Sequence, residues 1–194
     1  KMRNARHLYF IGCGTSYHAA SVGAVYFAQL AGRAVIPVLA PQFIPQYAPT
    51  VNHDDVGIFV SQSGETKDVL NALTAAEARG MACFGLANVV GSTLTKATSF
   101  SLPLCCGYEI SVPATKTFTN QVVTFLYLAY RLAGKDTSEL LRIPELMEQT
   151  IKMVGPQIEA IAKDINEWND MYCLGYGATY PIALEGALKL KEIT

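Results

Sequence analysis

Short apolar runs alternate with segments of helical periodicity from the N-terminus to about residue 135. The runs that indicate strands are residues 7–11, 34–38, 56–60, 81–86 and 100–104. Each is nearly continuous in apolar residues, which is typical of parallel strands covered on both faces. The pattern predicts a doubly wound (flavodoxin-like) α/β fold, in which helices flank a parallel five-stranded sheet.

Helices are expected between and after these runs. The predicted helices are residues 17–31, 68–79 and 115–133. Gly32 and Gly80 follow the first two and suit a left-handed helix end. The third helix has no charged residue between Lys116 and Arg131, so we expect burial on most of its sides, inside the fold or between subunits.

Beyond residue 135 the pattern changes. Residues 136–170 mix Glu, Lys and Gln with Ile, Leu and Met at helical spacing, which predicts a helical connector. Residues 171–174 indicate another strand, and a glycine turn and a helix from about Pro181 follow it. The sequence stops inside this helix at Thr194, which suggests a fragment of a longer polypeptide.

An internal repeat points to a second unit. Residues 172–180 share the frame of residues 9–17, with both glycines and both flanking tyrosines in register. One short match can arise by chance, but here it coincides with a predicted strand, turn and helix. We therefore expect a first domain at 1–135 and the truncated start of a similar unit at 171–194.

Charge and composition restrict the kinds of partner that we expect this protein to bind. The net charge of -1 supplies no field that attracts a polyanion, so nucleic acid and acidic membrane are not expected as partners. The sequence shows neither a leader nor an uncharged apolar run long enough to span a membrane. Hydrophobic residues make up 51% and charged residues 16%, which favours deep burial and a surface covered in an oligomer.

Cysteine and histidine give no sign of a metal or disulfide framework. The five cysteines are an odd number without paired or zinc-type spacing: Cys13, Cys83, Cys105, Cys106 and Cys173. They predict a reduced, cytoplasmic protein. The scattered His7, His18 and His53 offer no metal set and are interpreted as structural. We predict neither a metal nor another cofactor.

A glycine turn with hydroxyl groups follows the first predicted strand. Its residues are Gly12, Cys13, Gly14, Thr15 and Ser16. Glycine lets the backbone approach a ligand, and the N-terminus of the following helix favours an anion. The spacing matches neither a dinucleotide fingerprint nor a nucleotide P-loop. A tight turn closed by a Ser/Thr cap is an alternative.

A second polar turn, Ser61-Gln62-Ser63-Gly64-Glu65-Thr66, directly follows the third predicted strand. Its hydroxyls, amide and glycine at a strand C-terminus form a nest where neutral donors converge on a phosphate. Both turns follow strand C-termini, so we expect them at the same edge of the sheet. The alternative is a capping box with Ser63 as N-cap, although Glu65 stands one position early for it.

Two further stretches carry candidate chemistry. At the start of the long apolar helix, Thr115 and Thr117 either cap freed amides, the interpretation favoured without context, or reach a hydroxylated ligand. Near the end of the chain Glu185, Lys189 and Glu192 share one helical face. A cation between two carboxylates can tune one of them as a general base. From spacing alone, a solvated salt-bridge ladder is favoured for this face.

Together these stretches resemble the SIS (sugar isomerase) domain family, most closely the isomerase half of glutamine–fructose-6-phosphate amidotransferases. The motifs occur in that family's order: Cys13-Gly14-Thr15-Ser16, Ser61-Gln62-Ser63-Gly64-Glu65-Thr66, Ala114-Thr115-Lys116-Thr117-Phe118-Thr119 and Tyr180-Pro181-Ile182-Ala183-Leu184-Glu185-Gly186-Ala187-Leu188-Lys189-Leu190-Lys191-Glu192. The likeness covers nearly the whole chain, and its last block is the most specific.

The resemblance implies roles that spacing does not assign. It implies a small-molecule phosphosugar as partner and a homodimer as assembly. By match to the family's motifs, the substrate-binding positions are Cys13, Gly14, Thr15, Ser16, Ser61, Gln62, Ser63, Thr66, Val112 and Ala114. Glu192 corresponds to the base that moves a proton between C1 and C2, with Glu185 and Lys189 as its companions. The resemblance thereby outweighs the solvated-ladder interpretation.

The sequence also departs from the family's pattern. Ala114 stands where the family commonly has serine, so one sugar contact is missing or replaced. The family's ring-opening histidine and its sugar-binding lysine come after Thr194 in the motif order. The 194 residues do not include the family's glutaminase domain. We therefore expect phosphosugar isomerisation without release of ammonia from glutamine.

Three functions stay open at this point. The first is the isomerase part of an enzyme that converts fructose 6-phosphate to glucosamine 6-phosphate. The second is a stand-alone double-SIS phosphosugar isomerase or deaminase, and the third is a binding module that senses phosphosugars without turning them over. A glutaminase encoded upstream would separate the first from the second, and ligand binding without proton exchange would indicate the third.

Overall fold

The computed structural model describes residues 1–193. Within these residues the strands are β1 (Leu8–Gly12), β2 (Ile36–Leu39), β3 (Val56–Ser61), β4 (Ala82–Ala87) and β5 (Phe100–Pro103). They form one parallel sheet in the order β2-β1-β3-β4-β5. This is the flavodoxin-like order, and the predicted fold class is confirmed.

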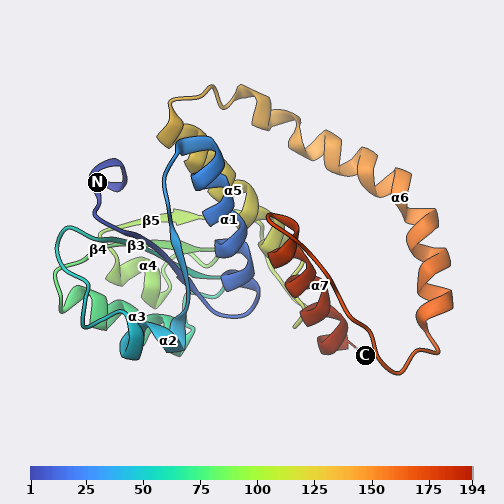
Figure 1. Cartoon of the computed structure of the whole chain (residues 1–194), viewed down its shortest axis with the longest axis horizontal. Coiled ribbons are helices and arrows are strands. Elements are labelled where there is room, and N and C mark those ends of the chain that lie inside the picture. Colours follow the sequence, from blue (N-terminus) through green and yellow to red (C-terminus); the bar gives the residue numbers. More distant parts are fainter. Residues whose placement is uncertain (194) are drawn as a thin grey trace.

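Helices cover both faces of the sheet. The α-helices are α1 (Thr15–Ala31), α2 (Ala40–Gln46), α3 (Lys67–Glu77), α4 (Thr93–Ala97), α5 (Lys116–Ala133), α6 (Ile143–Ile165) and α7 (Thr179–Ile193), with 3-10 turns η1 (Met2–Asn4) and η2 (Ser138–Arg142). Helices α1 and α5 lie on one face, whereas α2, α3 and α4 lie on the other (Figure 1). Helix α7 packs against α1.

The two layers of the core follow from the alternation of side chains along each strand. On β1, the ring of Phe10 packs on the α1 and α5 side, with ring centroids 5.0 Å from Phe27 and 4.5 Å from Phe125. Its neighbour Tyr9 faces α2, where its ring lies 6.3 Å from that of Phe43. Because both faces are filled by side chains, a ligand has access only to the edges of this sheet.

Within the described residues, helix α5 is fully buried along one side only. Its buried residues form one stripe at four-residue spacing: Thr117, Gln121, Phe125 and Ala129. This stripe packs on α1, where a Cβ at Gly23 would lie 2.5 Å from Cγ of Phe125. Tyr127, on another side, is exposed. Within a single chain α5 is fully buried along this stripe only, and the expectation of burial on most sides, inside the fold or between subunits, stays a prediction.

Two helices of the second face were not predicted. Helix α2 contains Pro41 in its first turn and Pro45 inside, and proline normally indicates a break. Proline is compatible with the first turn because the first amides of a helix need no intrahelical acceptor. Helix α2 is secured by Ala40 and Phe43, which are buried. Helix α4 is only five residues long, too short for a periodic signal.

The strand expected at residues 171–174 does not form. These residues have no regular secondary structure, and Tyr172 and Leu174 are almost fully exposed. Within residues 1–193 no strand lies beside them, and a strand needs a neighbour for its backbone hydrogen bonds. The prediction is therefore wrong for this structure.

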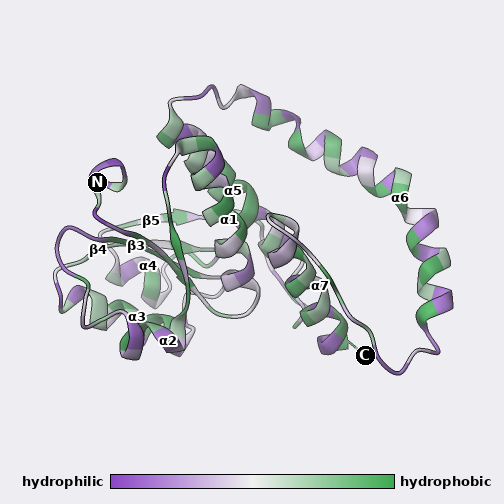
Figure 2. Ribbon diagram, viewed as in Figure 1, coloured by the Kyte–Doolittle hydropathy of each residue, from purple (hydrophilic) through white to green (hydrophobic). Residues whose placement is uncertain are grey.

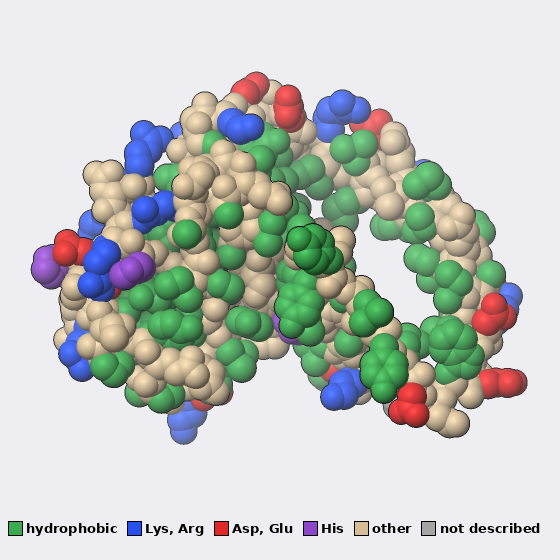
Figure 3. Space-filling view, viewed as in Figure 1, with side chains coloured by type: hydrophobic (Ala, Val, Ile, Leu, Met, Phe, Trp, Pro, Cys, Tyr) green, Lys and Arg blue, Asp and Glu red, His purple; other side chains and the backbone are tan. Residues whose placement is uncertain are grey.

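Residues 135–193 extend away from the sheet. Helix α6 runs outward and the chain returns to α7 beside α1 (Figure 1). Every residue of α6 is at least partly exposed, and apolar and polar residues alternate around the helix (Figure 2). Hydrophobic side chains of α6 and α7 gather on both sides of an opening (Figure 3). Residues 136–170, the range of the expected connector, contain η2 and α6.

The repeated sequence frame has a repeated geometry. A Cβ at Gly12 would lie 3.0–3.1 Å from atoms of Ser16, and a Cβ at Gly175 would lie 2.5 Å from the carbonyl oxygen of Thr179. In both turns the second glycine has a positive φ, +48° at Gly14 and +56° at Gly177. Each turn leads directly into a helix, α1 or α7. The close approach of chain and helix explains why both positions are glycine.

Among the helices of residues 1–193, none has both the length and the apolar composition required to cross a lipid bilayer.

Candidate functional site

The two polar turns leave adjacent strands at one edge of the sheet. Strands β1 and β3 are parallel neighbours, with Ile11 paired to Phe59. Residues 13–16 lead from β1 toward α1, and residues 61–66, here called the hydroxyl loop, lead from β3 to α3. Both helices therefore begin at this edge, where their first amides lack intrahelical acceptors. Two helix N-termini at one place favour an anion.

Ser61 organises the hydroxyl loop. Its Oγ accepts a hydrogen bond from the backbone N–H of Gly64 at 2.9 Å and lies 2.8 Å from Oγ1 of Thr66. Ser61 is only 2% exposed, whereas Gln62, Ser63 and Thr66 are partly exposed. The loop is therefore fixed by one buried hydroxyl and presents neutral donors to the solvent side.

Gly64 is required by the conformation of this loop. Its φ is +69°, in the left-handed region that favours glycine. A Cβ at this position would lie 2.0 Å from Oγ of Ser92 and 2.6 Å from its Cβ. Ser92 precedes α4, so the loop and the start of α4 pack directly against each other.

The carboxylate of the hydroxyl loop is engaged by α4. Oε1 of Glu65 accepts a hydrogen bond from the backbone N–H of Thr93 at 2.8 Å, and Oε2 accepts one from its Oγ1 at 2.7 Å. These two bonds lower the pKa of Glu65 below its ordinary value, so the side chain is ionised at neutral pH. The carboxylate is thereby held at Thr93, and the other polar side chains of the loop are neutral.

The turn after β1 contributes a buried hydroxyl. Ser16 is buried, and its Oγ accepts a hydrogen bond from Nε2 of Gln121 on α5 at 3.1 Å. Because the oxygen is the acceptor, the hydroxyl proton of Ser16 is available for another acceptor. Oε1 of Gln121 is buried and has no hydrogen-bond partner among residues 1–193. The hydroxyl of Ser16 and Oε1 of Gln121 can therefore each form one further hydrogen bond.

The charged residues of α7, here called the charged cluster (Glu185, Lys189 and Glu192), lie against the first turn of α1. Oγ1 of Thr15 donates to Oε1 of Glu185 at 2.9 Å and accepts from Nζ of Lys189 at 3.1 Å. Nζ of Lys189 lies 3.4 Å from Oε1 of Glu185 and 2.6 Å from Oε2 of Glu192. One lysine therefore bridges two carboxylates beside the turn after β1.

Glu185 is ionised although it is buried, with 7% of its side chain exposed. Burial raises the pKa of this carboxyl, but hydrogen bonds from His18 and Thr15 and the charge of Lys189 more than offset it. The net effect is a pKa below the ordinary value. A solvated salt-bridge ladder, the alternative for this face, does not describe Glu185 and Lys189, because both side chains are largely covered.

Side-chain capping does not account for the hydroxyl groups of these turns. The N-cap residues of α1, α3 and α5 are Gly14, Thr66 and Thr115, and within the described residues none makes a side-chain capping bond. Ser63, the N-cap of the alternative capping box, instead accepts from the backbone N–H of Glu65 at 3.2 Å. The capping alternatives are therefore wrong, and these hydroxyls bond instead within the hydroxyl loop, to the charged residues of α7 and to Glu109.

The loop before α5 is anchored but lies on the surface. Oε2 of Glu109 accepts hydrogen bonds from the backbone N–H and Oγ1 of Thr117, at 3.0 and 2.7 Å. Val112 is 87% exposed. Within residues 1–193 no hydrogen bond joins Val112 or Ala114 to the other candidates. The structure therefore assembles the hydroxyl loop, the turn after β1 and the charged cluster, and leaves these two positions outside.

Cys13, beside the site, and Cys83, at the opposite edge of the sheet, are thiols rather than nucleophiles. Burial, with a smaller contribution from the charge of Asp68, raises the pKa of Cys13 above its ordinary value. Burial also raises the pKa of Cys83 to about 12. Within the described residues no group of three or more His, Cys, Asp or Glu side chains is arranged to hold a metal ion.

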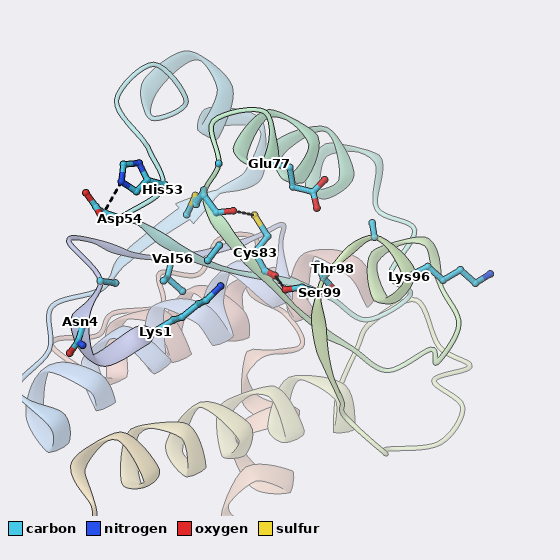
Figure 4. Close-up of a pocket in the computed structure, with 15 residues that line it drawn as sticks. Lys1, Asn4, His53, Asp54, Val56, Glu77, Cys83, Lys96, Thr98 and Ser99 are labelled. Carbon is cyan, nitrogen blue, oxygen red and sulfur yellow. Dashed lines mark hydrogen bonds and ion pairs between the residues drawn. The ribbon is translucent and has the colours of Figure 1, made fainter.

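A cavity of about 950 Å³ lies at the opposite edge of the sheet. It is bordered by the N-terminal ends of β3 and β4, near Val56 and Cys83, and by side chains such as Lys96 (Figure 4). His53 and Asp54 pair with each other at its rim, 3.5 Å apart. In parallel α/β sheets ligands bind at the C-terminal edge of the strands, so we assign the candidate site to the hydroxyl-loop edge.

Sequence reasoning missed two residues of this site. His18 was interpreted as structural, but its Nδ1 lies 2.7 Å from Oε2 of Glu185. The available signal was its position three residues after Thr15, which places both on one face of α1. Gln121, four residues after Thr117, became significant only when α5 was packed against Ser16.

The fold and the site define a class: a flavodoxin-like α/β protein whose C-terminal sheet edge carries a hydroxyl-rich loop beside a charged cluster with one buried carboxylate. Residues 1–131 match the SIS domain family. The chain therefore belongs to the SIS domain family.

Relatives of known name share this sequence. The glutamine–fructose-6-phosphate aminotransferase [isomerizing] of Aquifex aeolicus is 41% identical over 100% of this chain and 33% of its own length. The protein of the same name from Saccharomyces cerevisiae is 35% identical over 100% of this chain and 28% of its own. The chain thus spans about a third of the length of these curated relatives.

A solved structure agrees with these likenesses. The C-terminal domain of glucosamine-fructose-6-phosphate aminotransferase from Francisella tularensis superposes with a TM-score of 0.86 at 27% identity, over 99% of this chain and 57% of that chain. The resemblance inferred from the motifs is confirmed for the family and for the fold.

Proposed function

We propose that this chain is a phosphosugar isomerase domain that acts on fructose 6-phosphate and glucosamine 6-phosphate, within an enzyme of the glutamine–fructose-6-phosphate aminotransferase type. The observation that carries the proposal is the charged cluster on the first turn of α1, next to the hydroxyl loop on the neighbouring strand. The names of relatives with 35–41% identity support the same reaction.

The phosphate would be held by neutral groups. The candidates are the hydroxyl loop, through Ser61, Gln62, Ser63 and Thr66, and the turn after β1, through Ser16 and the backbone of Cys13 and Gly14. Two helix N-termini supply partial positive charge at this edge. A neutral holder suits a chain whose net charge is -1, because the anion is bound by dipoles and hydrogen bonds rather than by a cationic patch.

The proton transfer would be carried by Glu192. In the open-chain ketose, its carboxylate takes the proton from C1, the electrons of the C–H bond form a C1–C2 double bond, and the C2 carbonyl oxygen takes a proton from water to become a hydroxyl. Return of the proton from Glu192 to C2, with release of the proton on O1 to water, leaves the carbonyl at C1. Lys189, 2.6 Å from Glu192, keeps the carboxylate oriented before transfer.

The proposal extends to the assembly and the surroundings of the chain. Residues 1–135 form the first unit, residues 136–170 the connector, and residues 171–193 the start of a second unit, as the matching glycine turns support. The exposed apolar side chains of α6 and α7 support a homodimer. Sedimentation of the full natural polypeptide tests the dimer. The free cysteines support a location in the cytoplasm.

Isotope exchange tests the reaction. In the full natural polypeptide, Glu192→Gln should lower hydrogen exchange at C1 of fructose 6-phosphate by about 10²- to 10⁴-fold, the usual contribution of a general base. Binding of the sugar phosphate should change little. The control is Glu148→Gln, an exposed glutamate on α6 paired with Lys152. Full exchange in Glu192→Gln would contradict the assignment, and binding without exchange in the wild type would indicate a sensing module.

A further inference from the structure

His18 joins the charged cluster from outside α7. It lies one turn after Thr15 on α1, and its Nδ1 is 2.7 Å from Oε2 of Glu185. The two side chains are 13% and 7% exposed, so water does not readily replace either partner. A hydrogen bond to an ionised, buried carboxylate is among the stronger polar contacts in a protein.

The two oxygens of Glu185 are held by different donors. Oε2 faces His18, whereas Oε1 accepts from Thr15 at 2.9 Å and lies 3.4 Å from Nζ of Lys189. With a donor on each oxygen, rotation of the carboxylate would break at least one contact. Without His18, Oε2 would be left buried without its donor, and burial of an unpaired charge is unfavourable.

The orientation of Glu185 is passed on to the rest of the cluster. Nζ of Lys189 is fixed by three neighbours: Glu185 at 3.4 Å, Thr15 at 3.1 Å and Glu192 at 2.6 Å. A shift of Glu185 removes one of these and changes where the ammonium lies. The carboxylate of Glu192 follows, since the ammonium is its partner.

We propose that His18 is a positioning residue: it holds Glu185, which fixes Lys189 and thereby the orientation of Glu192. This role rests on the proposed function, because it serves the proton transfer assigned to Glu192. His18 does not touch the hydroxyl loop in any hydrogen bond among residues 1–193. The effect of His18 therefore falls on turnover rather than on phosphate binding.

The electrostatics around Glu185 predict a pH effect. The titratable groups that face it are His18 on α1 and Lys189 on α7, and Glu192 is linked to it through Lys189. The hydrogen bond from His18 is the largest of the interactions that lower the pKa of Glu185. Its loss should raise that pKa and move the acid limb of the pH–rate profile to higher pH.

Three substitutions in the full natural polypeptide test the role. His18→Leu removes the donor. His18→Asn keeps a donor where Nδ1 was, because both nitrogens are bonded to Cγ. His18→Gln keeps an amide but moves it one methylene further out. The measurements are kcat and KM for hydrogen exchange at C1 of fructose 6-phosphate, as a function of pH.

We expect His18→Leu and His18→Gln to lower kcat by about ten- to a hundredfold with less than about a twofold change in KM, and to shift the acid limb upward. His18→Asn should stay within about threefold of the wild type. A wild-type kcat and pH profile in His18→Gln would overturn the proposal, and so would equal losses in His18→Asn and His18→Gln. If His18→Leu does not fold, the comparison of His18→Asn with His18→Gln still tests the proposal.

The wild-type enzyme separates the two hypotheses. If the wild type shows no exchange, the proposed function is wrong. If the wild type exchanges normally and the His18 variants are unaffected, only the positioning role is wrong.

Discussion

The hydroxyl loop and the charged cluster lie at one edge of the sheet but are held by different means. In the hydroxyl loop, Ser61 bonds to residues three and five positions further along the chain. In the charged cluster, Glu185 bonds to Thr15 and His18, which are 170 and 167 positions away. The contacts of Ser61 are local to one turn, whereas those of Glu185 form only when a distant helix docks.

The difference also appears in the packing. Ser61 ends a strand whose residues are all buried, whereas the buried residues of α7 are Pro181 and Glu185. The attachment of α7 to α1 therefore depends heavily on polar contacts at Glu185. Local opening of α7 should be easier than opening of the sheet edge, and the two halves should respond separately to substitution.

The largest expected effect is on the hydroxyl loop. Gly64→Ala should lower the free energy of unfolding by about 3 kcal/mol, because it adds the strain of a positive φ to a clash with Ser92. Gly91→Ala is the control, since Gly91 also has a positive φ but no described atom lies within 4 Å of its Cβ position. Gly91→Ala should lower the free energy of unfolding by about 1 kcal/mol. Equal losses in urea denaturation would contradict the clash.

The second effect is on the docking of α7. Glu185→Gln should cost about 2 kcal/mol of local stability, so the amides of α7 should exchange with deuterium about 30-fold faster while those of β3 stay unchanged. The matched control is Glu148→Gln, which breaks an exposed pair with Lys152 at the same helical spacing. That change should alter exchange less than about twofold. Faster exchange in β3 would show that the two halves are not independent.

Lowering the pH should change the hydrogen exchange of the amides of α7 about tenfold, and this response should distinguish α7 from the hydroxyl loop. The folded-state pKa of Glu185 is below its ordinary value of about 4.3. Its contribution is therefore complete above that value and is lost as pH falls through the folded-state pKa. Hydrogen exchange between about pH 6 and pH 3, corrected for the intrinsic rate, measures this loss. In Glu185→Gln the extra pH dependence of α7 should disappear.

The smallest effect compares two serines of the hydroxyl loop. Ser61→Ala should lower the free energy of unfolding by about 1 kcal/mol, because it removes the buried acceptor of Gly64. Ser63→Ala should lower it by less than about 0.5 kcal/mol, because its oxygen serves Glu65 at 3.2 Å on the surface. Denaturant titration distinguishes them. A larger loss of unfolding free energy in Ser63→Ala than in Ser61→Ala would show that Ser63 holds the loop together.

Much of the fold was predictable because its signals are local. Buried parallel strands are continuous apolar runs, and their positions were predicted to within two residues at each end. Helix α2 was missed because Pro41 and Pro45 indicate a break while the burial of Phe43 is a tertiary fact. The strand expected at residues 171–174 failed for the same reason, since a strand is defined by its neighbour and not by its own composition.

The candidate site divides in the same way. The sequence by itself determined the hydroxyl loop, because Ser61, Gly64 and Thr66 act on one another within a single turn. It also placed Glu185, Lys189 and Glu192 on one face of a helix. Only the tertiary structure decided that this face is buried on α1 and that His18 belongs to it. Helical periodicity sets which side chains point together, but the pKa of a carboxylate depends on the partners and the burial that packing supplies.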